Sequence, residues 1–333
     1  MLKNNFKFAL HAKYTGIFDL SDENAPVCFL PGSMITVEFT GTEIVLVVRD
    51  VTGSDNNWIN VIIDSGEPYA IHIKKDLDRY VLAQSLENSH HKVEIYKRTE
   101  AFFGHLQFCD FELPDGGIFL RPSYDSGRKI EFIGDSITCG DANESLIPDN
   151  TDADTENNYL AYGAVAARLL NAEHITVAAS GTGCYQNFGG TKAGRMSDYY
   201  IETISPMIEN LPYLHKWSPD VVVINLGTND FSADIAVENY KQRYRELLGF
   251  IRGRYKGACI LCTIGPMRVD PGEYIQAVVE EFNSRGDKNI FYMMFPLIDM
   301  EEDGVGGDGH PSVKTHRKMA EMLAGEIKNR LGW

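Results

Sequence analysis

Short apolar runs separated by turn residues fill residues 1–112 of the chain. The residues between the runs are rich in Gly, Asp, Asn and Ser, and no amphipathic helical pattern interrupts them. Many short strands at even spacing, without intervening helices, predict an antiparallel β-sandwich or jelly roll. The expected strands are "SMITVEFTG", "EIVLVVRD", "WINVIIDSG", "YAIHIKKD", "YVLAQSL", "HKVEIYKR" and "GHLQFCDFEL".

The pattern changes at Lys129, after which apolar runs alternate with helical periodicity. The expected strands are "KIEFIG", "HITVAA", "DVVVINLG", "ACILCTIGP" and "NIFYMMFPL". The expected helices are "NYLAYGAVAARLLN", "VENYKQRYRELLGFIRGRY", "YIQAVVEEFNSR" and "VKTHRKMAEMLAGEIKNRL". Strands that are apolar on both faces indicate a parallel sheet with helices packed on each side.

The segment between the two patterns, "LPDGGIFLRPSYDSGR", contains Pro, Gly and Ser and is predicted to be a linker. We therefore expect a β-sandwich domain over residues 1–112, a linker over 113–128 and an α/β domain over 129–333. The length of 333 residues agrees with two domains better than with one.

The net charge of the chain limits the classes of molecule that it is expected to bind. The net charge is −16 and the isoelectric point is about 5.0. Such an acidic chain is a poor partner for a nucleic-acid backbone or an anionic membrane surface. A neutral or weakly charged substrate fits it better.

No apolar run approaches the ~18 residues that span a bilayer, and the N-terminus has no sustained apolar stretch typical of a signal peptide. We expect a cytoplasmic protein, or a secreted one if a signal has been removed. Cys259 and Cys262 form a CxxC motif within a predicted buried strand. Since positions three apart on a strand face opposite sides, these cysteines are interpreted as buried structural thiols and not as a metal or redox pair.

In an open parallel sheet, ligands bind beyond the carboxyl ends of the strands. After the first strand, "GDSITCG" places Ser136 at the start of the following segment, where it could be a nucleophile or a helix N-cap. It is not the G-x-S-x-G elbow, because Thr138 stands at the second glycine's position. After the second strand, Gly181 and Gly183 could aim a backbone N–H at a ligand, or could simply form a flexible loop. "GTGCYQ" lacks the third glycine of the dinucleotide fingerprint, so NAD binding is not expected.

Candidate catalytic residues also follow two further strands. Asn229 follows the third strand and could donate its side-chain amide to an oxyanion or stabilise its own turn. His310 precedes the last helix, where it could act as a general base or lie on a surface loop. Taken in order, the four strand ends supply a nucleophile, two kinds of oxyanion donor and a base. Acyl transfer from an ester needs this set of groups.

The ordered blocks "GDSITCG", "SGTG", "GTND" and "DGHP" resemble the four signature blocks of the SGNH (GDSL-type) hydrolases. The N-terminal half resembles the jelly-roll domain of carbohydrate esterase family 2 in "PGSMITVEFTGTEIVLVV", "INVIIDSG" and "KRTEAFFGHLQF". The block "SGTGCYQNFGG" also resembles that family's extended second block. The resemblance implies an α/β SGNH-hydrolase domain with a flavodoxin-like three-layer parallel sheet, preceded by an all-β jelly-roll domain. It also implies an enzyme that removes acetyl groups from plant polysaccharides such as xylan and glucomannan.

Carried onto this sequence, the resemblance implies that Ser136 attacks the acetyl carbonyl and that His310 is the base. The oxyanion would be held by the N–H groups of Ser136 and Gly181 and by the amide of Asn229. SGNH enzymes generally have an aspartate three residues before the histidine, but that position is Gly307 here. Asp308, two residues before His310, could orient the imidazole from an extended loop, or a main-chain carbonyl could hold it instead.

The resemblance also implies the partners of the protein. It implies no metal and no organic cofactor, and a partner that is an acetylated plant oligosaccharide or polysaccharide. The residues considered for substrate contact are Asp135, Tyr185, Phe188 and Phe231. No nucleic-acid or membrane partner is expected, and the sequence does not determine the oligomeric state. Two alternative functions stay open, an SGNH lipase or thioesterase and a carbohydrate-binding protein with weak activity.

Overall fold

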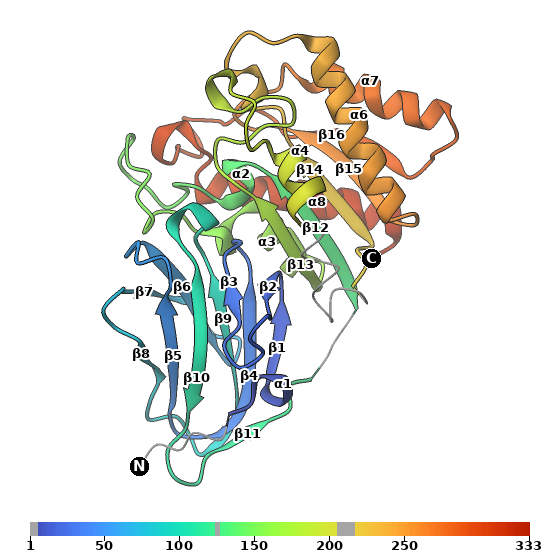
Figure 1. Cartoon of the computed structure of the whole chain (residues 1–333). Coiled ribbons are helices and arrows are strands. Elements are labelled where there is room, and N and C mark those ends of the chain that lie inside the picture. Colours follow the sequence, from blue (N-terminus) through green and yellow to red (C-terminus); the bar gives the residue numbers. More distant parts are fainter. Residues whose placement is uncertain (1–5, 124–126, 205–216) are drawn as a thin grey trace. The chain divides into compact units, whose positions relative to one another are not determined.

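A computed structural model describes residues 6–123, 127–204 and 217–333, and Figure 1 shows the course of the chain. The chain forms two compact units, Met1–Ser126 and Gly127–Trp333. The first unit is built mainly of strands, and the second alternates strands with helices. The change of hydrophobic period at Lys129 therefore corresponds to a change of architecture.

Two antiparallel sheets make up the N-terminal unit. One has the order β1-β4-β9-β6-β7, with β11 beside β4, and the other has the order β2-β3-β10-β5-β8. The predicted all-β sandwich is confirmed. Its strands are β1 (Ala12–Thr15), β2 (Phe18–Asp19), β3 (Val27–Cys28), β4 (Met34–Gly41), β5 (Ile44–Asp50), β6 (Asn57–Ile63), β7 (Tyr69–Ile73), β8 (Arg79–Ala83), β9 (Ser89–Lys97), β10 (Leu106–Glu112) and β11 (Ile118–Leu120). Two short helices accompany them, α1 (Phe8–His11) and η1 (Ala101–Phe103).

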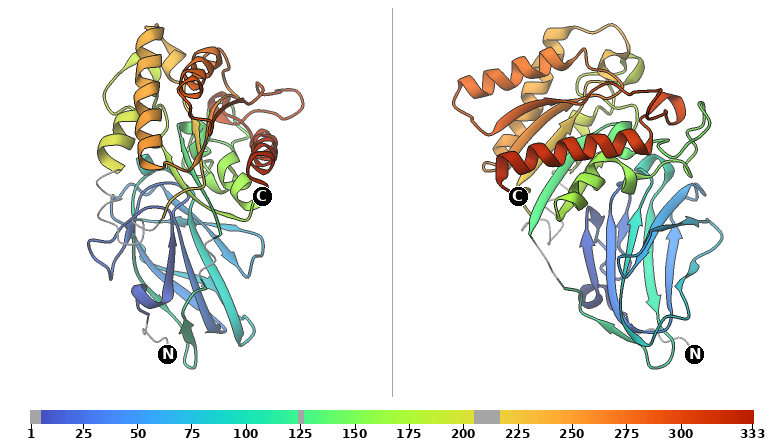
Figure 2. Two further views of the ribbon diagram at one scale, coloured as in Figure 1. Left: turned by 90° about the vertical axis from the view of Figure 1, so that its right-hand side faces the viewer. Right: turned by 180° about the vertical axis from the view of Figure 1, so that it is seen from behind.

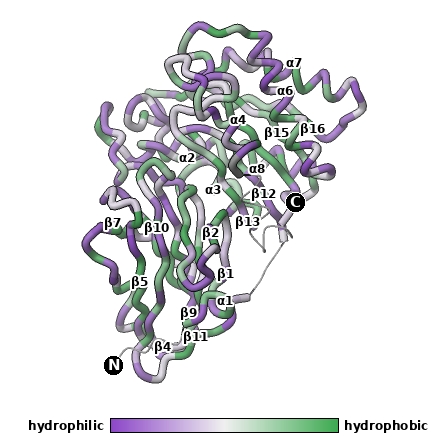
Figure 3. The backbone as a smooth tube through the Cα atoms, in the orientation of Figure 1, coloured by the Kyte–Doolittle hydropathy of each residue, from purple (hydrophilic) through white to green (hydrophobic). Residues whose placement is uncertain are grey.

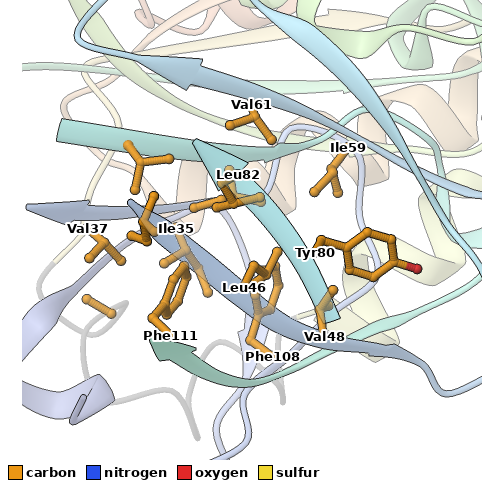
Figure 4. Packing of buried hydrophobic residues seen from close by; sticks show 14 of the residues in the cluster. Ile35, Val37, Leu46, Val48, Ile59, Val61, Tyr80, Leu82, Phe108 and Phe111 are labelled. Carbon is orange, nitrogen blue, oxygen red and sulfur yellow. The ribbon is translucent and has the colours of Figure 1, made fainter. Parts of the chain in front are cut away.

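Apolar side chains from both sheets fill the space between them. In β4, Ile35 and Val37 are fully buried, and Leu46 and Val48 of β5 are fully buried as well. Figure 4 shows these side chains together with aromatic rings such as Phe111 of β10. Because successive side chains of a strand point to opposite faces, the alternating positions of each strand supply one wall of this core. Their burial provides the main driving force for folding of the unit.

The segment predicted as a linker, residues 113–128, is structured over its first part. Leu113 is buried in the sandwich core. β11 pairs antiparallel with β4, with Phe119 opposite Phe39. The residues "PDGG" form a turn that the hydrogen bond from Gly117 N–H to the Pro114 carbonyl closes at 2.9 Å, and the apolar run after the turn gains sheet hydrogen bonds. Residues 124–126 lie outside the described residues.

A five-stranded parallel sheet forms the centre of the C-terminal unit, in the order β13-β12-β14-β15-β16. Every residue of β14 and β15 is buried. This burial is expected for parallel strands that are covered on both faces. The strands are β12 (Arg128–Gly134), β13 (Ala172–Ala178), β14 (Val221–Asn225), β15 (Cys259–Ile264) and β16 (Ile290–Met294). The predicted strands and the predicted fold class are confirmed.

Helices cover the two faces of this sheet, as Figures 1 and 2 show. α3 and α8 pack on one face in a single apolar cluster with β12, β14 and β15. α6 and α7 lie on the other face. The longer helices are α3 (Tyr162–Leu169), α6 (Val237–Arg254), α7 (Gly272–Ser284) and α8 (Val313–Leu331). The short elements are α2 (Ser136–Cys139), η2 (Asn158–Leu160), η3 (Phe188–Gly190), α4 (Met196–Asp198), η4 (Tyr199–Ile204), η6 (Asp230–Ser232) and η7 (Gly307–Gly309).

The hydropathy of the chain follows this layering. Figure 3 shows hydrophobic residues along β12 and β15 and many hydrophilic residues along α6. Cys259 belongs to the cluster under α3 and α8, whereas Cys262 interacts with Tyr244 of α6 on the opposite face. Both thiols are free and buried, as predicted. Among the helices that the structure describes, none has the length and apolar character needed to cross a membrane.

Candidate active site

Ser136 follows the first strand of the parallel sheet through a tight turn. β12 ends at Gly134, where a Cβ atom would overlap the side chain of Thr138, so a larger residue does not fit. Asp135 is the N-cap of α2, and its carboxylate accepts a hydrogen bond from the Ile137 N–H at 3.1 Å. Because Asp135 takes the capping role, the Ser136 hydroxyl is available to another partner.

His310 is that partner. Its Nε2 lies 2.9 Å from Ser136 Oγ, and its Nδ1 lies 3.0 Å from the carbonyl oxygen of Gly307. A carbonyl oxygen can only accept, so Nδ1 carries the proton and Nε2 accepts from the serine hydroxyl. Both side chains are almost entirely buried. The pair forms a serine–histidine dyad in the tautomer that lets the imidazole take the serine proton.

The place beside His310 Nδ1, where a triad aspartate would lie, is occupied by the Gly307 carbonyl group. Asp308 is exposed and has a φ of +49°, in the left-handed region. This reversal of the backbone within η7 breaks the extended geometry that would put residues 308 and 310 on one side. Of the two alternatives that the sequence left open, the structure shows the main-chain carbonyl on Nδ1.

Two predicted oxyanion donors lie at the next strand ends. Gly181 has a φ of +74° and open space where a Cβ would be. The Asn229 side-chain amide donates to the Thr182 carbonyl at 2.9 Å and to Asp135 Oδ2 at 3.2 Å. Burial raises the pKa of Asp135 to about 7, and the nearby Asp230 charge adds to the rise. These contacts fix the Asn229 amide between the first and second loops, beside Ser136.

Asp230 gives the second loop its shape. Its carboxylate accepts hydrogen bonds from the backbone N–H groups of Cys184, Tyr185 and Gln186 at 2.9, 2.6 and 3.0 Å. At Gly183 a Cβ atom would overlap the Gln186 carbonyl oxygen. The glycine and the aspartate are therefore needed for one tight loop, which carries Gly181 into the site.

A cavity of about 580 Å³ opens at this edge of the sheet. Phe188 lies beside this cavity and is 71% exposed. The cavity contains the four groups that the sequence predicted to act together. Its lining residues are Ser136, Asp141, Ser180, Gly181, Phe188, Thr228, Asn229, Ser232, Met267, Arg268, Asp308 and His310.

Three of the residues considered for substrate contact are not among those that line the cavity. Asp135 is fully buried beneath Asn229. The Tyr185 hydroxyl accepts a hydrogen bond from Lys192 Nζ at 2.7 Å, which holds its ring at the edge of the second loop. Phe231 stacks on Tyr274, with ring centroids 5.6 Å apart. Of the aromatic residues considered, Phe188 lies at the cavity.

Six residues of the cavity were not predicted from the sequence: Asp141, Ser180, Thr228, Ser232, Met267 and Arg268. Asp141 follows the left-handed Gly140 that ends α2, and its Oδ2 lies 3.7 Å from His310 Nε2. Met267 and Arg268 follow β15. The sequence did contain a signal for Met267 and Arg268, because they follow β15, whose carboxyl end lies at the same edge of the sheet. Asp141 lies five residues after Ser136, and only the turn at Gly140 brings it back to the site.

Within residues 6–123, 127–204 and 217–333, no group of three or more His, Cys, Asp or Glu side chains is arranged to hold a metal ion. The cavity offers a hydroxyl, an imidazole, an amide, backbone N–H groups and two carboxylates. A hydroxyl hydrogen-bonded to a base, with amide donors beside it, can perform acyl transfer through a covalent serine intermediate.

Family models match both halves of the chain. Residues 14–122 match the model described as "Carbohydrate esterase 2 N-terminal", and residues 132–318 match the "GDSL-like Lipase/Acylhydrolase family". The cellulase/esterase CelE of Acetivibrio thermocellus is 38% identical over 96% of this chain, which spans 39% of that protein. An acetylxylan esterase / glucomannan deacetylase of Cellvibrio japonicus is 25% identical, with 97% of this chain and 90% of that protein covered.

The structure is also similar to solved ones. A family two carbohydrate esterase from Clostridium thermocellum, solved in complex with cellohexaose, has a TM-score of 0.87 and is 37% identical, with 97% of this chain and 99% of that chain covered. Since the aligned parts include both units, the similarity extends over the sandwich and the parallel sheet together.

Proposed function

Because this chain belongs to carbohydrate esterase family 2, with a GDSL-like hydrolase domain behind a sandwich domain, we propose that it removes acetyl groups from hemicellulose oligosaccharides. The substrates would be acetylated mannan, glucomannan or xylan fragments. The observation that carries the proposal is the 2.9 Å contact between Ser136 Oγ and His310 Nε2 at the cavity. The names of the Cellvibrio japonicus relative support the choice of substrate.

The proposed reaction has two halves. In the first, His310 Nε2 takes the Ser136 proton while Ser136 Oγ attacks the acetyl carbonyl, and the proton then passes to the departing sugar oxygen. In the second, a water molecule gives a proton to Nε2 and attacks the acetyl-serine; Nε2 then returns this proton to Ser136 Oγ as acetate leaves, which restores the serine and the neutral imidazole. The Gly307 carbonyl keeps Nδ1 protonated throughout, which holds Nε2 in the accepting form.

The negative charge that develops on the carbonyl oxygen needs donors. Ser136 is the first residue of α2, so its N–H has no partner within the helix and can donate. The Gly181 N–H completes the proposed oxyanion hole together with the Asn229 amide, which would share with the oxyanion the N–H of its longer contact, 3.2 Å to Asp135 Oδ2. Fixed dipoles of this kind stabilise the transition state without having to reorganise during the reaction.

The lining of the cavity supports a sugar substrate better than a lipid. Apart from Phe188 and Met267, the side chains that face it are polar or charged. Phe188 is exposed enough to stack against a sugar ring, while serine, threonine and aspartate groups can hydrogen-bond hydroxyls. We therefore favour a saccharide ester over the lipase or thioesterase alternative.

The test is acetate release from acetylated manno-oligosaccharides and xylo-oligosaccharides. The unmodified protein should release acetate, and Ser136→Ala should lose the activity. Ser284→Ala, which changes an exposed serine at the end of α7, is the matched control and should keep it. The ratio of rates on the two substrates identifies the preferred polysaccharide, and an unmodified protein without activity on either would refute the proposal.

A second candidate function is the binding of unacetylated β-glucan. The solved relative from Clostridium thermocellum was obtained with cellohexaose, which carries no acetyl group to remove. Calorimetric titration of Ser136→Ala with cellohexaose tests whether this chain shares that property. Binding that is lost in Phe188→Ala would place the glucan at the cavity.

A further inference from the structure

We propose that Asp141 is the anionic partner of His310 in this chain, acting from the Nε2 side of the imidazole. The proposal deepens the esterase function and rests on it. A neutral carbonyl group holds Nδ1, so the carboxylate that usually stabilises the imidazolium from that side has no counterpart there. Asp141 supplies the charge from the opposite edge of the ring.

The position of Asp141 is set by the turn that carries the nucleophile. Gly140 ends α2 in the left-handed conformation, with a φ of +83°. The Asp141 N–H then donates to the Ser136 carbonyl at 3.0 Å. This return of the chain brings Asp141 Oδ2 to 3.7 Å from His310 Nε2. The carboxylate and the serine are thus held by the same few residues.

Asp141 is shielded from solvent, which strengthens its electrostatic effect. Its side chain is 13% exposed and that of His310 is 9% exposed. The Ser180 hydroxyl donates to Asp141 Oδ2 at 3.5 Å. Burial raises the pKa of the Asp141 carboxyl; His310 and Ser180 oppose the rise, while the charge of Asp308 adds to it. The Ala142 N–H also hydrogen-bonds this carboxylate and opposes the rise.

The effect of this carboxylate differs between the resting state and the reaction. Before attack, the imidazole is neutral and its Nε2 lone pair accepts from the Ser136 hydroxyl, so the ring and the Asp141 carboxylate do not form an ion pair. When the Ser136 proton moves to Nε2, the ring becomes an imidazolium ion and faces a carboxylate at ion-pair distance. An interaction that is attractive only after proton transfer accelerates the chemical step and does not merely tighten binding.

The first experiment measures the pH dependence of kcat/KM on 4-nitrophenyl acetate, a probe without a sugar, so that lost sugar contacts cannot explain the result. Asp141→Asn should lower the plateau of the pH profile by about 10- to 100-fold and move its acid limb to lower pH, because removal of a nearby anion disfavours the charged imidazole. Asp141→Glu should recover part of the loss. A purely structural role would lower the plateau and leave the limb in place.

Asp149→Asn is the matched control. It removes the same charge from an exposed position that does not line the cavity, next to Pro148, whose carbonyl accepts a hydrogen bond from the Asp308 N–H. It should change kcat/KM by less than about threefold and leave the acid limb in place, since exposed charges are screened by solvent. A limb that moves equally in both variants would overturn the special role of Asp141.

A second measurement is independent of activity. The NMR titration of the His310 ring, assigned by its loss in His310→Asn, should have its midpoint at lower pH in Asp141→Asn than in the unmodified protein. Burial lowers the pKa of His174 and His316 to about 3, so these two rings stay neutral above about pH 5. An unchanged midpoint would overturn the proposal whatever the activity. If no ester is hydrolysed, the esterase function fails, while the midpoint still decides the pairing of Asp141 with His310.

Discussion

Replacement of Gly307 by alanine is expected to displace the carbonyl group that orients His310. Gly307 is buried, and a Cβ atom there would overlap the Asn150 carbonyl oxygen and come within 3.0 Å of the Ala142 side chain. The Gly307 N–H also donates to the Ala142 carbonyl at 3.1 Å. Since neighbours confine the residue on two sides, the loop must move and must carry the carbonyl group with it.

The size of the effect follows from the hydrogen bond that is lost. The Gly307 carbonyl accepts from Nδ1 at 3.0 Å, and this ring becomes charged during the reaction. A hydrogen bond to a charged group contributes about 1.5–3 kcal/mol. At about 1.4 kcal/mol for each factor of ten, kcat should fall by about 10- to 150-fold. KM should change little, because Gly307 does not line the cavity.

Steady-state kinetics on 4-nitrophenyl acetate, with thermal melting followed by circular dichroism, would measure both consequences. Gly309→Ala is the control in the same loop. A Cβ at Gly309 meets nothing within 4 Å, but the φ of +73° is unfavourable for alanine. This variant should lose about 1–2 kcal/mol of stability and keep its kcat.

Two results would refute the reasoning. A folded Gly307→Ala protein with unchanged kcat would show that the carbonyl group does not orient the base. An equal loss of kcat in Gly309→Ala would show that general disturbance of the loop, and not the displaced carbonyl, causes the effect.

Three further predictions concern the oxyanion donor, a buried charge and the sugar platform. Asn229→Ala should lower kcat on any acetyl ester by about 10²- to 10³-fold, the usual effect of removing one oxyanion donor; a loss below threefold would exclude that role. Burial raises the pKa of Glu131 to about 7 from 4.5, and Tyr200 donates to it at 2.9 Å. The folded state therefore holds the proton that the unfolded state releases, so stability falls as pH rises from about 4.5 to 7. Glu131→Gln stays neutral, and its free energy of unfolding relative to the unmodified protein should rise by about 3 kcal/mol between pH 4 and pH 8.5, measured by urea unfolding. Phe188→Ala should raise KM for acetylated oligosaccharides by about tenfold and leave kinetics on 4-nitrophenyl acetate unchanged, because only a sugar ring needs the stacking surface; equal effects on both substrates would contradict this role.

Much of the fold could be predicted from the sequence, because hydrophobic period is a local property. The strands from "SMITVEFTG" onward and the five strands of the parallel sheet were predicted for this reason. The short strands β1, β2, β3 and β11 were not. They have two to four residues each, too few for a period to appear, and they form because a neighbouring strand offers hydrogen bonds.

The rule that ligands bind beyond the carboxyl ends of parallel strands identified four residues from the amino-acid sequence alone: Ser136, Gly181, Asn229 and His310. It works because parallel strands all end at one edge of the sheet, so residues far apart in sequence converge there. The rule says nothing about where a side chain points beyond the strand. Tyr185 and Phe231 follow strands of the same sheet, yet their rings turn toward Lys192 and Tyr274.

The sequence by itself determined the two architectures, the order of the site blocks and the residue types that could carry out acyl transfer. Only the tertiary structure decided that a main-chain carbonyl holds His310 and that Asp141 lies beside Nε2. Both outcomes depend on backbone reversals, at residue 308 and at Gly140. A single residue in the left-handed conformation changes the direction of the chain, and therefore changes which side chains lie next to each other. The spacing of hydrophobic residues in the sequence does not reveal such a change.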